Sequence, residues 1–280
     1  MSPSTDTDSE QDESASVTSS EGLFARFLSP AFVFPALVGL AALGIWDGVV
    51  RLSGSELFPK PIEVVRGMGE LATKGLLLKY VVASLFRVTW GFVLAVLVGV
   101  PFGLMLGWYR WAHQAFNPMI QMLRPISPIA WIPVAILWFG VSDAAPVFLI
   151  FLASVFPIAV TSAAAVRSVQ PVHLRAAQNF GLGRVELFRR VILPAALPQI
   201  MTGLRIALGI AWLVVVAAEM IAVNSGLGYL IIDARNAGKR YDLVVAGMLL
   251  IGVIGWLLDL LVRQVERVRA LSWAYDNRGE

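Results

Sequence analysis

Long runs of apolar residues without a charged side chain are the feature that most constrains this chain. A helix needs about 20 predominantly apolar residues to cross the hydrocarbon core of a bilayer. Six runs approach or exceed this length, the fifth interrupted only by Arg205, and they occupy residues 27–46, 88–109, 125–142, 144–166, 191–218 and 243–258. The third run can start near residue 116, and the sixth can extend to residue 261. The sequence therefore predicts six membrane-spanning helices.

The amino-acid composition indicates that lipid surrounds these runs. Of the 280 residues, 58% are hydrophobic and 15% are charged, whereas soluble domains average about 45–50% apolar and about 25% charged residues. In lipid, only helices and closed β-barrels satisfy every backbone hydrogen-bonding group. The runs are much longer than the ~10-residue alternating strands of a membrane barrel. The predicted fold class is therefore all-α, in a polytopic membrane protein.

The two ends of the chain differ in composition from its apolar middle. Residues 1–22 contain six acidic side chains, no Lys or Arg and few large apolar side chains. Such a segment cannot bury enough surface to order itself. We expect a disordered acidic cytoplasmic tail over 1–22, a transmembrane domain over 23–270 and a short cytoplasmic tail over 271–280.

The basic residues predict how the spans are oriented, because Lys and Arg are favoured in cytoplasmic loops. With the N-terminus inside, the cytoplasmic side receives eleven of them and the outer side eight, and dense basic groups at 184–190 and 263–269 adjoin span ends. We therefore expect a multi-pass protein of the cell or inner membrane with both termini in the cytoplasm. On the outer side, residues 75–87 predict an interfacial helix that leads into the second span. Its apolar face consists of Leu77, Tyr80, Val81 and Leu85.

The sequence pattern argues against several kinds of chemistry. There is no cysteine, which excludes thiolate metal sites and cysteine nucleophiles. His113 and His173 are far apart in the sequence, so neither a metal centre nor a cofactor is expected. Asp47 and Asp259 lie near span ends and form no paired-carboxylate arrangement for acid–base catalysis. The formal charge of +3 fits basic loops and not a nucleic-acid-binding surface.

The longest predicted cytoplasmic loop, residues 167–195, has the pattern of two short helices joined by a turn. Pro171 suits the first turn of a helix, and Gly181 and Gly183 suit its end. Residues 184–192 can form the second helix. The two helices are expected to meet at an angle close to the bilayer.

The second predicted helix of this loop is amphipathic. Val185, Phe188 and Ile192 share one face, and Pro194 and Pro198 mark the start of the fifth span. An exposed apolar ridge of this kind fits a groove on a soluble partner. The residues alone leave a second interpretation open, in which the basic loop lies on anionic lipid head groups.

The spacing within the loop carries a resemblance to a known family. In order, the loop has Arg175-Ala176-Ala177, three residues, Gly181, nine residues, Val191, one residue and Leu193-Pro194. This register resembles the EAA motif, E-A-A-x3-G-x9-I-x-L-P, of binding-protein-dependent ABC importer permeases, with Arg175 in place of the glutamate. Further stretches resemble the nitrate/sulfonate/taurine/bicarbonate branch of that family, and they are residues 84–92, 124–140, 202–221 and 226–236.

The resemblance implies a type I ABC importer permease fold and a set of partners. These are ATPase subunits, an extracytoplasmic substrate-binding protein, a second permease copy and membrane lipid, without nucleic acid. The chain itself would not be an enzyme, and it has no G-x4-G-K-[ST] motif, so ATP hydrolysis would belong to a partner. The residues implied in coupling to the ATPase are Arg175, Ala176, Ala177, Gly181, Val185, Phe188, Leu193 and Pro194.

Charged residues in or beside the spans are candidates for the translocation pathway, because such charges are costly in lipid. Arg124 lies beside several prolines and can meet an anion in transit, or it can snorkel to the inner interface. Glu219 is expected to pair with Arg87 across two helices and to shape the outer gate, or to form a purely structural ion pair. Arg205 is about 21 Å from Glu219 along one helix, so it is expected to snorkel or to bond the loop.

Glycines predict close contacts at two places. Gly99, Gly103 and Gly107 form a ladder of small residues that suits helix packing within the subunit or at a dimer seam. Gly226 and Gly228 predict a tight turn on the outer side.

These features together predict the permease subunit of an ATP-driven importer. It would form the pathway for a small oxyanion, either nitrate or taurine or another sulfonate, which the binding protein delivers. The 175–194 segment would couple the pathway to a separate ATPase. The alternative is a self-sufficient secondary carrier or channel, which predicts inverted repeats and ionisable residues at mid-membrane in both halves.

Overall fold

The computed structural model of the protein describes residues 30–54 and 58–266, and every regular element within these ranges is a helix. The predicted all-α fold is therefore confirmed for this part of the chain. The predicted tails, 1–22 and 271–280, lie outside the described residues. The chain divides into two compact units, Met1–Glu63 and Val64–Glu280.

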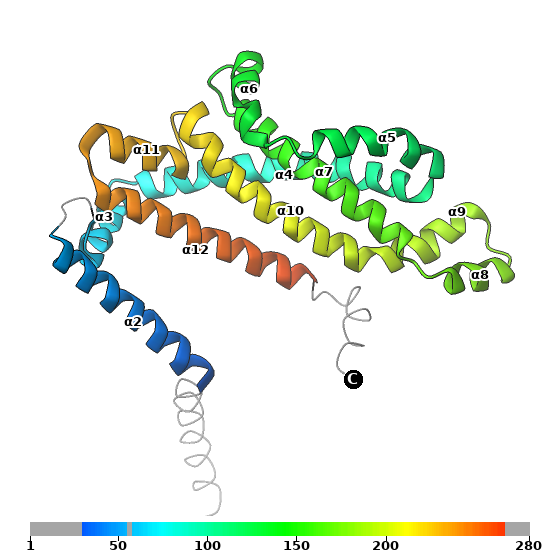
Figure 1. Cartoon of the computed structure of the whole chain (residues 1–280), viewed down its shortest axis with the longest axis horizontal. Coiled ribbons are helices and arrows are strands. Elements are labelled where there is room, and N and C mark those ends of the chain that lie inside the picture. The colour runs from blue at the N-terminus through cyan, green and yellow to red at the C-terminus, as the bar shows by residue number, and fades with distance from the viewer. Residues whose placement is uncertain (1–29, 55–57, 267–280) are drawn as a thin grey trace, which may run out of the picture. The chain divides into compact units, whose positions relative to one another are not determined.

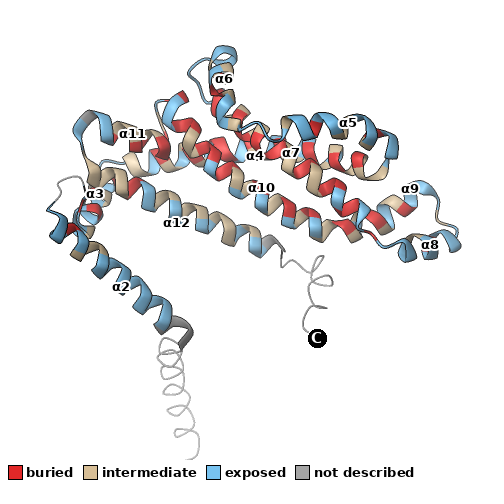
Figure 2. Cartoon of the chain, in the orientation of Figure 1, coloured by how far each residue is buried: buried red, intermediate tan, exposed pale blue. Residues whose placement is uncertain are grey.

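The first unit contains α2 (Pro30–Ser53), which corresponds to the first predicted span. It continues to Ser53, beyond the predicted end at residue 46. Its residues are largely exposed (Figure 2) and its sequence is apolar, which are the properties expected of a helix that crosses lipid.

The second unit contains the remaining helices (Figure 1). The exception is the first turn of α3, which precedes the start of this unit at Val64. Here η1 is a 3₁₀-helix and η2 a π-helix. In chain order the helices are α3 (Pro61–Thr73), α4 (Leu76–Trp108), α5 (Arg110–Leu123), η1 (Pro128–Trp131), α6 (Ile132–Phe139), α7 (Ala144–Arg167), α8 (Pro171–Asn179), α9 (Arg184–Leu187), η2 (Phe188–Ile192), α10 (Leu193–Ala222), α11 (Leu227–Gly238) and α12 (Tyr241–Glu266).

Five of the described helices are long and apolar enough to cross a membrane, and the number becomes six if a bent pair of helices forms one span. The pair consists of α5 and the η1–α6 segment, with an angle of 83° between them. The third predicted span, 125–142, is therefore a broken span that starts earlier, at Arg110. The sequence predicted the six crossings but not this bend.

The packing of α4 on α7 explains why the bent pair must make a crossing. Gly91 of α4 lies against Ile150 of α7, and Gly107 lies against Val166. The residue numbers rise together, so the two helices are parallel. The chain must return between them from one end of the bundle to the other, and α5, η1 and α6 make that return.

The small-residue ladder of α4 lies within this contact. A Cβ atom on Gly103 would lie 2.4 Å from the carbonyl oxygen of Ala159, and one on Gly99 would lie 2.9 Å from the Ile158 side chain. The glycines thus allow the two backbones to approach closely. Of the two predicted roles, packing within the subunit is the one observed.

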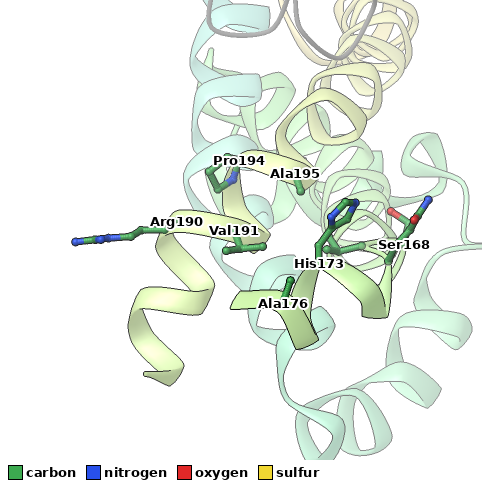
Figure 3. Close-up of a pocket in the computed structure, with 9 residues that line it drawn as sticks. Ser168, His173, Ala176, Arg190, Val191, Pro194 and Ala195 are labelled. Carbon is green, nitrogen blue, oxygen red and sulfur yellow. The ribbon is translucent and has the colours of Figure 1, made fainter. Parts of the chain in front are cut away.

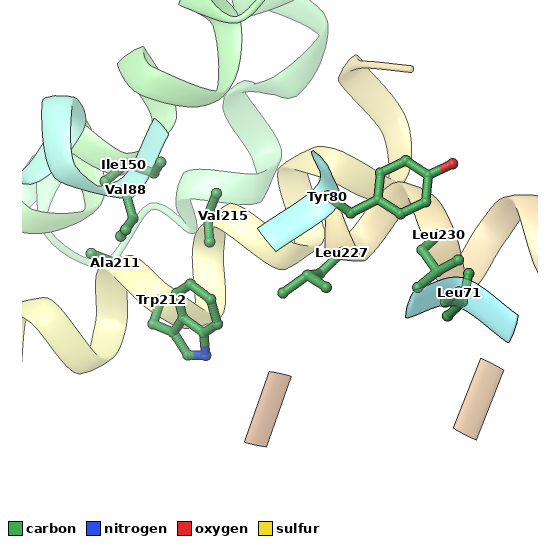
Figure 4. Close-up of a cluster of buried hydrophobic side chains, with 9 residues drawn as sticks. All are labelled: Leu71, Tyr80, Val88, Ile150, Ala211, Trp212, Val215, Leu227 and Leu230. Carbon is green, nitrogen blue, oxygen red and sulfur yellow. The ribbon is translucent and has the colours of Figure 1, made fainter. Parts of the chain in front are cut away.

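The helices α10 and α12 complete the bundle. A cluster of buried side chains joins them to α3, α4, α7 and α11 (Figure 4). Its members are Leu71, Tyr80, Val88, Ile150, Ala211, Trp212, Val215, Leu227 and Leu230. The ring nitrogen of Trp212 donates a hydrogen bond to the carbonyl of Ile251 (3.1 Å), which fixes α10 against α12.

The predicted helix over 75–87 leads into the second span without a break. The segment is the first part of α4, which runs as one helix from Leu76 to Trp108. Its predicted apolar face is confirmed, because Tyr80 is buried and Leu77 packs on the same cluster.

A group of ion pairs ties α3 to the start of α12. Arg240 contacts Glu70 at 2.7 Å and Asp242 at 2.7 Å, and Lys74 contacts Glu70 at 2.7 Å. The hydrogen bond from Arg240, followed by that from Lys74, lowers the pKa of Glu70 from 4.5 to about 2. The carboxylate therefore stays ionised in the folded protein at pH values where it is protonated in the unfolded chain.

We predict that Glu70→Gln changes how stability depends on acid pH. Because the folded-state pKa is depressed, the contribution of Glu70 is complete above pH 4.5 and is lost as the pH falls toward 2. Thermal unfolding in detergent should show a lower Tm for the variant near neutral pH, with the difference shrinking as the pH falls below 4.5. A difference that stays constant through this range would contradict the assignment.

We predict opposite effects of alanine at two helical glycines. Gly103→Ala should destabilise the protein by about 1–3 kcal/mol, because the added methyl group overlaps the α7 backbone. Gly252→Ala is the matched control, since a Cβ there meets nothing within 4 Å, and its helix propensity should give a gain of up to ~1 kcal/mol. The free energy of unfolding checks both, and equal effects at the two sites would refute the packing argument.

Candidate functional site

The turn that joins α8 to α9 is fixed by backbone hydrogen bonds. As predicted, Pro171 opens α8, and Gly181 adopts a left-handed conformation with φ 81°. The Gly181 N–H donates to the carbonyl of Gln178 (2.9 Å), and the Leu182 N–H donates to that of Ala177 (3.2 Å). These two bonds are those of a Schellman motif. The turn therefore has a defined shape.

The second helix of the loop continues into the fifth span, which corrects the prediction of a separate short helix. A single helical segment runs from Arg184 to Ala222 through α9, η2 and α10. We call this segment the long helix. The turns just before Pro194 are wound as a π-helix, and such wider turns accommodate a residue that lacks a backbone N–H. Pro194 and Pro198 therefore lie inside the long helix and do not interrupt it.

The exposed surface of the loop differs from the predicted ridge. Val185 is 71% exposed, but Ile192 is only 2% exposed. Phe188 packs edge-on against Trp108 of α4, with ring centroids 5.5 Å apart. Phe180, which the sequence argument passed over, is 85% exposed at the turn. Val185 and Phe180 thus project from the loop, while Phe188 and Ile192 hold it against the bundle.

The residues implied in coupling all lie in this loop, and they divide by exposure. Five are exposed: Arg175, Ala176, Gly181, Val185 and Pro194. Three are partly or fully buried: Ala177, Phe188 and Leu193. The first group is available to a partner, and the second group supports the loop from inside.

A hollow of about 520 Å³ lies between α8 and the start of α10 (Figure 3). Its wall includes His173 and Ala176 of α8 and Val191 and Ala195 of the long helix. Arg190 also borders it but extends away from the other lining side chains (Figure 3). The loop therefore presents a concave, mainly apolar surface with Arg190 at its edge.

A second cavity, of about 480 Å³, lies at the bend of the broken span. We call it the Arg124 cavity. Arg124 follows the last residue of α5, and the other walls are residues 152–161 of α7 and Ile206 and Ile210 of α10. These are the middle parts of two long spans, so the cavity lies at mid-depth in the bundle.

The course of α5 shows that Arg124 is far from the loop end of the bundle. Phe116 of α5 packs against Phe102 of α4, with ring centroids 5.4 Å apart, so α5 runs back along α4. Arg124 is 14 residues beyond Arg110, or ~21 Å along a helix. Arg124 therefore lies well away from the loop end of the bundle.

At the opposite end of the bundle, Arg87 is the centre of a buried polar network. Its guanidinium contacts Glu219 of α10 at 2.7 Å and Asp143, just before α7, at 2.6 Å. It also donates to the carbonyl oxygen of Ser225 (2.7 Å) and to the Ser225 hydroxyl. Arg87 and Glu219 are 1% and 0% exposed. The predicted pairing of Arg87 with Glu219 is confirmed.

The hydrogen bonds of this network use every donor that Arg87 has. An arginine side chain carries five N–H groups. Nε and Nη2 donate to Asp143, Nη1 donates to Glu219 and to the Ser225 carbonyl, and Nη2 also donates to the Ser225 hydroxyl. Arg87 therefore has no N–H left for a further anion in this conformation.

The loop after α10 folds over Glu219 and completes the network. Glu219 accepts hydrogen bonds from the Ser84 hydroxyl (2.8 Å) and the Gly228 N–H (3.0 Å). Gly226 has φ 107°, and a Cβ there would lie 2.3 Å from the Glu219 carboxylate. One on Gly228 would lie 2.2 Å from the Val216 carbonyl. The predicted tight turn is present because both positions exclude a side chain.

Arg205 has a different role from the one predicted. It pairs with Asp259 of α12 at 2.6 Å, and Asp259 also contacts Arg263 at 2.8 Å. This ion pair joins α10 to α12, so Arg205 helps to hold these two helices of the bundle together.

Asp47, the other acidic residue near a span end, contacts Arg51, four residues along α2, at 2.7 Å.

Three members of the Arg87 network were not predicted. Asp143 had a usable signal, because it is the one acidic residue that separates the third and fourth apolar runs. Ser84 and Ser225 had none, because serines occur in many spans and turns.

The comparisons with known proteins agree with this architecture. The family described as binding-protein-dependent transport system inner membrane component matches residues 99–269. The taurine transport system permease protein TauC of Escherichia coli is 38% identical over 240 residues, which are 82% of this chain and 86% of that protein. The nitrate import permease protein NrtB of Leptolyngbya laminosa is 34% identical over 236 residues, 81% of this chain and 84% of that protein.

A solved structure shares the fold. The inward-facing MetNI methionine ABC transporter matches with a TM-score of 0.61 at 18% identity, over 70% of this chain and 97% of that chain. The fold and loop define a multi-pass membrane permease. The chain belongs to the family of binding-protein-dependent transport system inner membrane components. It is the permease component of an ABC importer and not itself an enzyme.

We predict unequal effects of removing the two acids that pair with Arg87. Glu219→Ala should cost about 3–5 kcal/mol of stability, because it leaves a buried charge without its buried partner. Asp143→Asn should cost ~1 kcal/mol or less, because the Asp143 side chain is 61% exposed. Unfolding in detergent measures both, and an equal cost for the two variants would contradict the network as described.

Proposed function

We propose that this chain forms the translocation pathway of an ATP-driven importer for a small oxyanion, either nitrate or taurine or another sulfonate. An extracytoplasmic binding protein delivers the substrate, and a separate ATPase drives the cycle. The names of the relatives support the substrate class, since one is a taurine permease and the other a nitrate import permease.

The observation that carries this proposal is the attachment of the loop to the long helix. That helix has 39 residues, or a length of about 58 Å at 1.5 Å per residue. The fixed turn at Gly181 holds α8 against the start of the same helix. A partner that binds the loop and moves it therefore also moves α10, because no flexible joint separates the loop from that helix.

The exposed part of the loop is the surface that the ATPase binds. Phe180 and Val185 supply apolar contacts, and Ala176 is exposed on the same loop. Arg175 stands exposed where the EAA motif has glutamate, so its contact with the ATPase is to an acidic or carbonyl group. The residues with coupling roles are Arg175, Ala176, Ala177, Gly181, Val185, Phe188, Leu193 and Pro194.

The protein is oriented with the loop and both termini in the cytoplasm. In this orientation residues 1–22 form an acidic tail, residues 23–270 the transmembrane domain and residues 271–280 a short tail. Exposed basic side chains at the loop end, including Arg110, Arg184 and Arg189, support this orientation. Two copies of the chain, surrounded by lipid, form the pathway together.

The three pathway candidates divide by position. Arg87 and Glu219 shape the outer gate, because their network joins α4, α7 and α10 at the end opposite the loop. Arg124 lines the pathway at mid-depth. The saturation of the Arg87 donors supports a shaping role and not direct contact with the substrate.

We predict that an acidic residue on the loop releases the ATPase without unfolding the spans. Val185→Asp should reduce the ATPase retained on the purified permease about tenfold or more, because it places a charge in an apolar contact that would be buried in the complex. Val65→Asp on α3 is the matched control: Val65 is 62% exposed and Val185 is 71% exposed. Co-purification and thermal unfolding are the two measurements.

Two outcomes would contradict the proposal. One is full retention of the ATPase by both Val185→Asp and a variant with a shortened 175–194 segment. The other is uptake into vesicles that proceeds without nucleotide, which would favour a self-sufficient carrier.

A further inference from the structure

The Arg124 cavity places a positive charge at mid-depth in the bundle, where a charge in a membrane has its highest free-energy cost. A guanidinium at the middle of a membrane costs at least about 2.5–3.5 kcal/mol. Such a residue is retained when something compensates the charge. The cavity at the bend of the broken span is therefore the place to look for the compensating group.

No such group is present in the described part of the chain. The backbone N–H of Arg124 donates to the Ile120 carbonyl. Its guanidinium makes no hydrogen bond or ion pair within residues 30–54 and 58–266, and the cavity has no acidic side chain in its wall. By contrast, Arg87 has all its donors satisfied, and Arg205 pairs with Asp259 at 2.6 Å. Arg124 therefore keeps its planar donor groups free for a ligand.

The rest of the wall restricts what that ligand is. Trp131, Phe156, Ile206 and Ile210 supply apolar surface. Thr161 is the one hydroxyl in the wall, and it donates its hydrogen to the Pro157 carbonyl at 2.8 Å. The cavity thus combines one fork of N–H donors, which suits two oxygens of an anion, with a wall that suits a hydrocarbon group.

The size of the cavity fits a small organic molecule. Its volume is about 480 Å³, and ligand pockets commonly measure roughly 300–1,000 Å³. The free guanidinium and the apolar wall together favour an organic anion over a bare inorganic one, which would leave the wall without a partner.

We propose that the Arg124 cavity is a binding subsite within the membrane for a small organic oxyanion, with a sulfonate or carboxylate on Arg124 and the hydrocarbon part against Trp131 and Phe156. The subsite rests on the proposed function, because it deepens the role of Arg124 as a wall of the pathway. It makes the permease itself a contributor to substrate selection, in addition to the binding protein.

The first experiment measures binding to the full-length permease in detergent by thermal shift. The probes are butanesulfonate, nitrate and uncharged butanol, and the variants are Arg124→Gln and Arg124→Lys. Arg110→Gln is the matched control, because Arg110 is an exposed arginine at the other end of α5. All four proteins are compared without ligand to verify that they fold.

The expected result is stabilisation of the wild type and of Arg110→Gln by butanesulfonate, with no shift from butanol and a smaller one from nitrate. Arg124→Gln should weaken binding about tenfold to a hundredfold, since a hydrogen bond to a charged group is worth ~1.5–3 kcal/mol. Arg124→Lys should bind with intermediate affinity, because it keeps the charge but loses the fork. The proposal is overturned by equal binding to Arg124→Gln, by equal binding of nitrate, or by no binding to the wild type.

A second experiment separates failure of the subsite from failure of the proposed function. Uptake of taurine is measured in vesicles that hold the permease, its ATPase and its binding protein. ATP-dependent uptake that is unchanged in Arg124→Gln would overturn the subsite and leave the importer function intact. Uptake by the wild type without ATP would overturn the importer function, while the binding result still decides the subsite.

Discussion

One uninterrupted helix joins the two ends of this bundle, and the rest of the account depends on it. It starts at Arg184 in the loop and ends at Ala222, three residues after the buried Glu219. A helix without a break transmits displacement along its axis, whereas a hinge would absorb it. The loop and the Arg87 network therefore lie at the two ends of one helix.

The Arg87 network fixes the other end of that helix. It joins α4, the start of α7 and the loop after α10 through one guanidinium. The buried contact to Glu219 is costly to break, because either charge alone in the interior is poorly compensated. The Asp143 side chain is largely exposed. Water can therefore solvate it when the ion pair breaks, so breaking this contact costs less free energy than breaking the contact to Glu219. The network thus pairs one buried acid and one exposed acid with the same guanidinium.

The sequence predicted features that depend on local chemistry. The apolar runs gave six crossings because the length needed to span lipid is a local property. The turn at Gly181 followed from the conformational freedom of glycine. The pair of Arg87 and Glu219 was predictable because both residues lie at the same end of long spans.

Features that depend on distant partners were not predictable. The 83° bend of the broken span follows from the packing of α5 back along α4. Because α5 runs away from the loop end, Arg124 at its far end lies deep in the bundle. The inward position of Phe188 depends on Trp108, 80 residues earlier in the chain. The continuity of the long helix depends on π-helical turns before Pro194, while proline patterns favour a break.

The most direct test of the account is a distance measurement between spin labels in the assembled importer. The chain has no cysteine, so a label at Arg189→Cys, an exposed position outside the proposed ATPase contact, reports the loop alone, and a second at Asn224→Cys reports the far end of the long helix. With a non-hydrolysable ATP analogue, the account predicts that the two loops of the assembly approach each other while the 189–224 distance within each chain stays constant. A within-chain distance that changes as much as the distance between loops, or loops that do not respond to nucleotide, would contradict it.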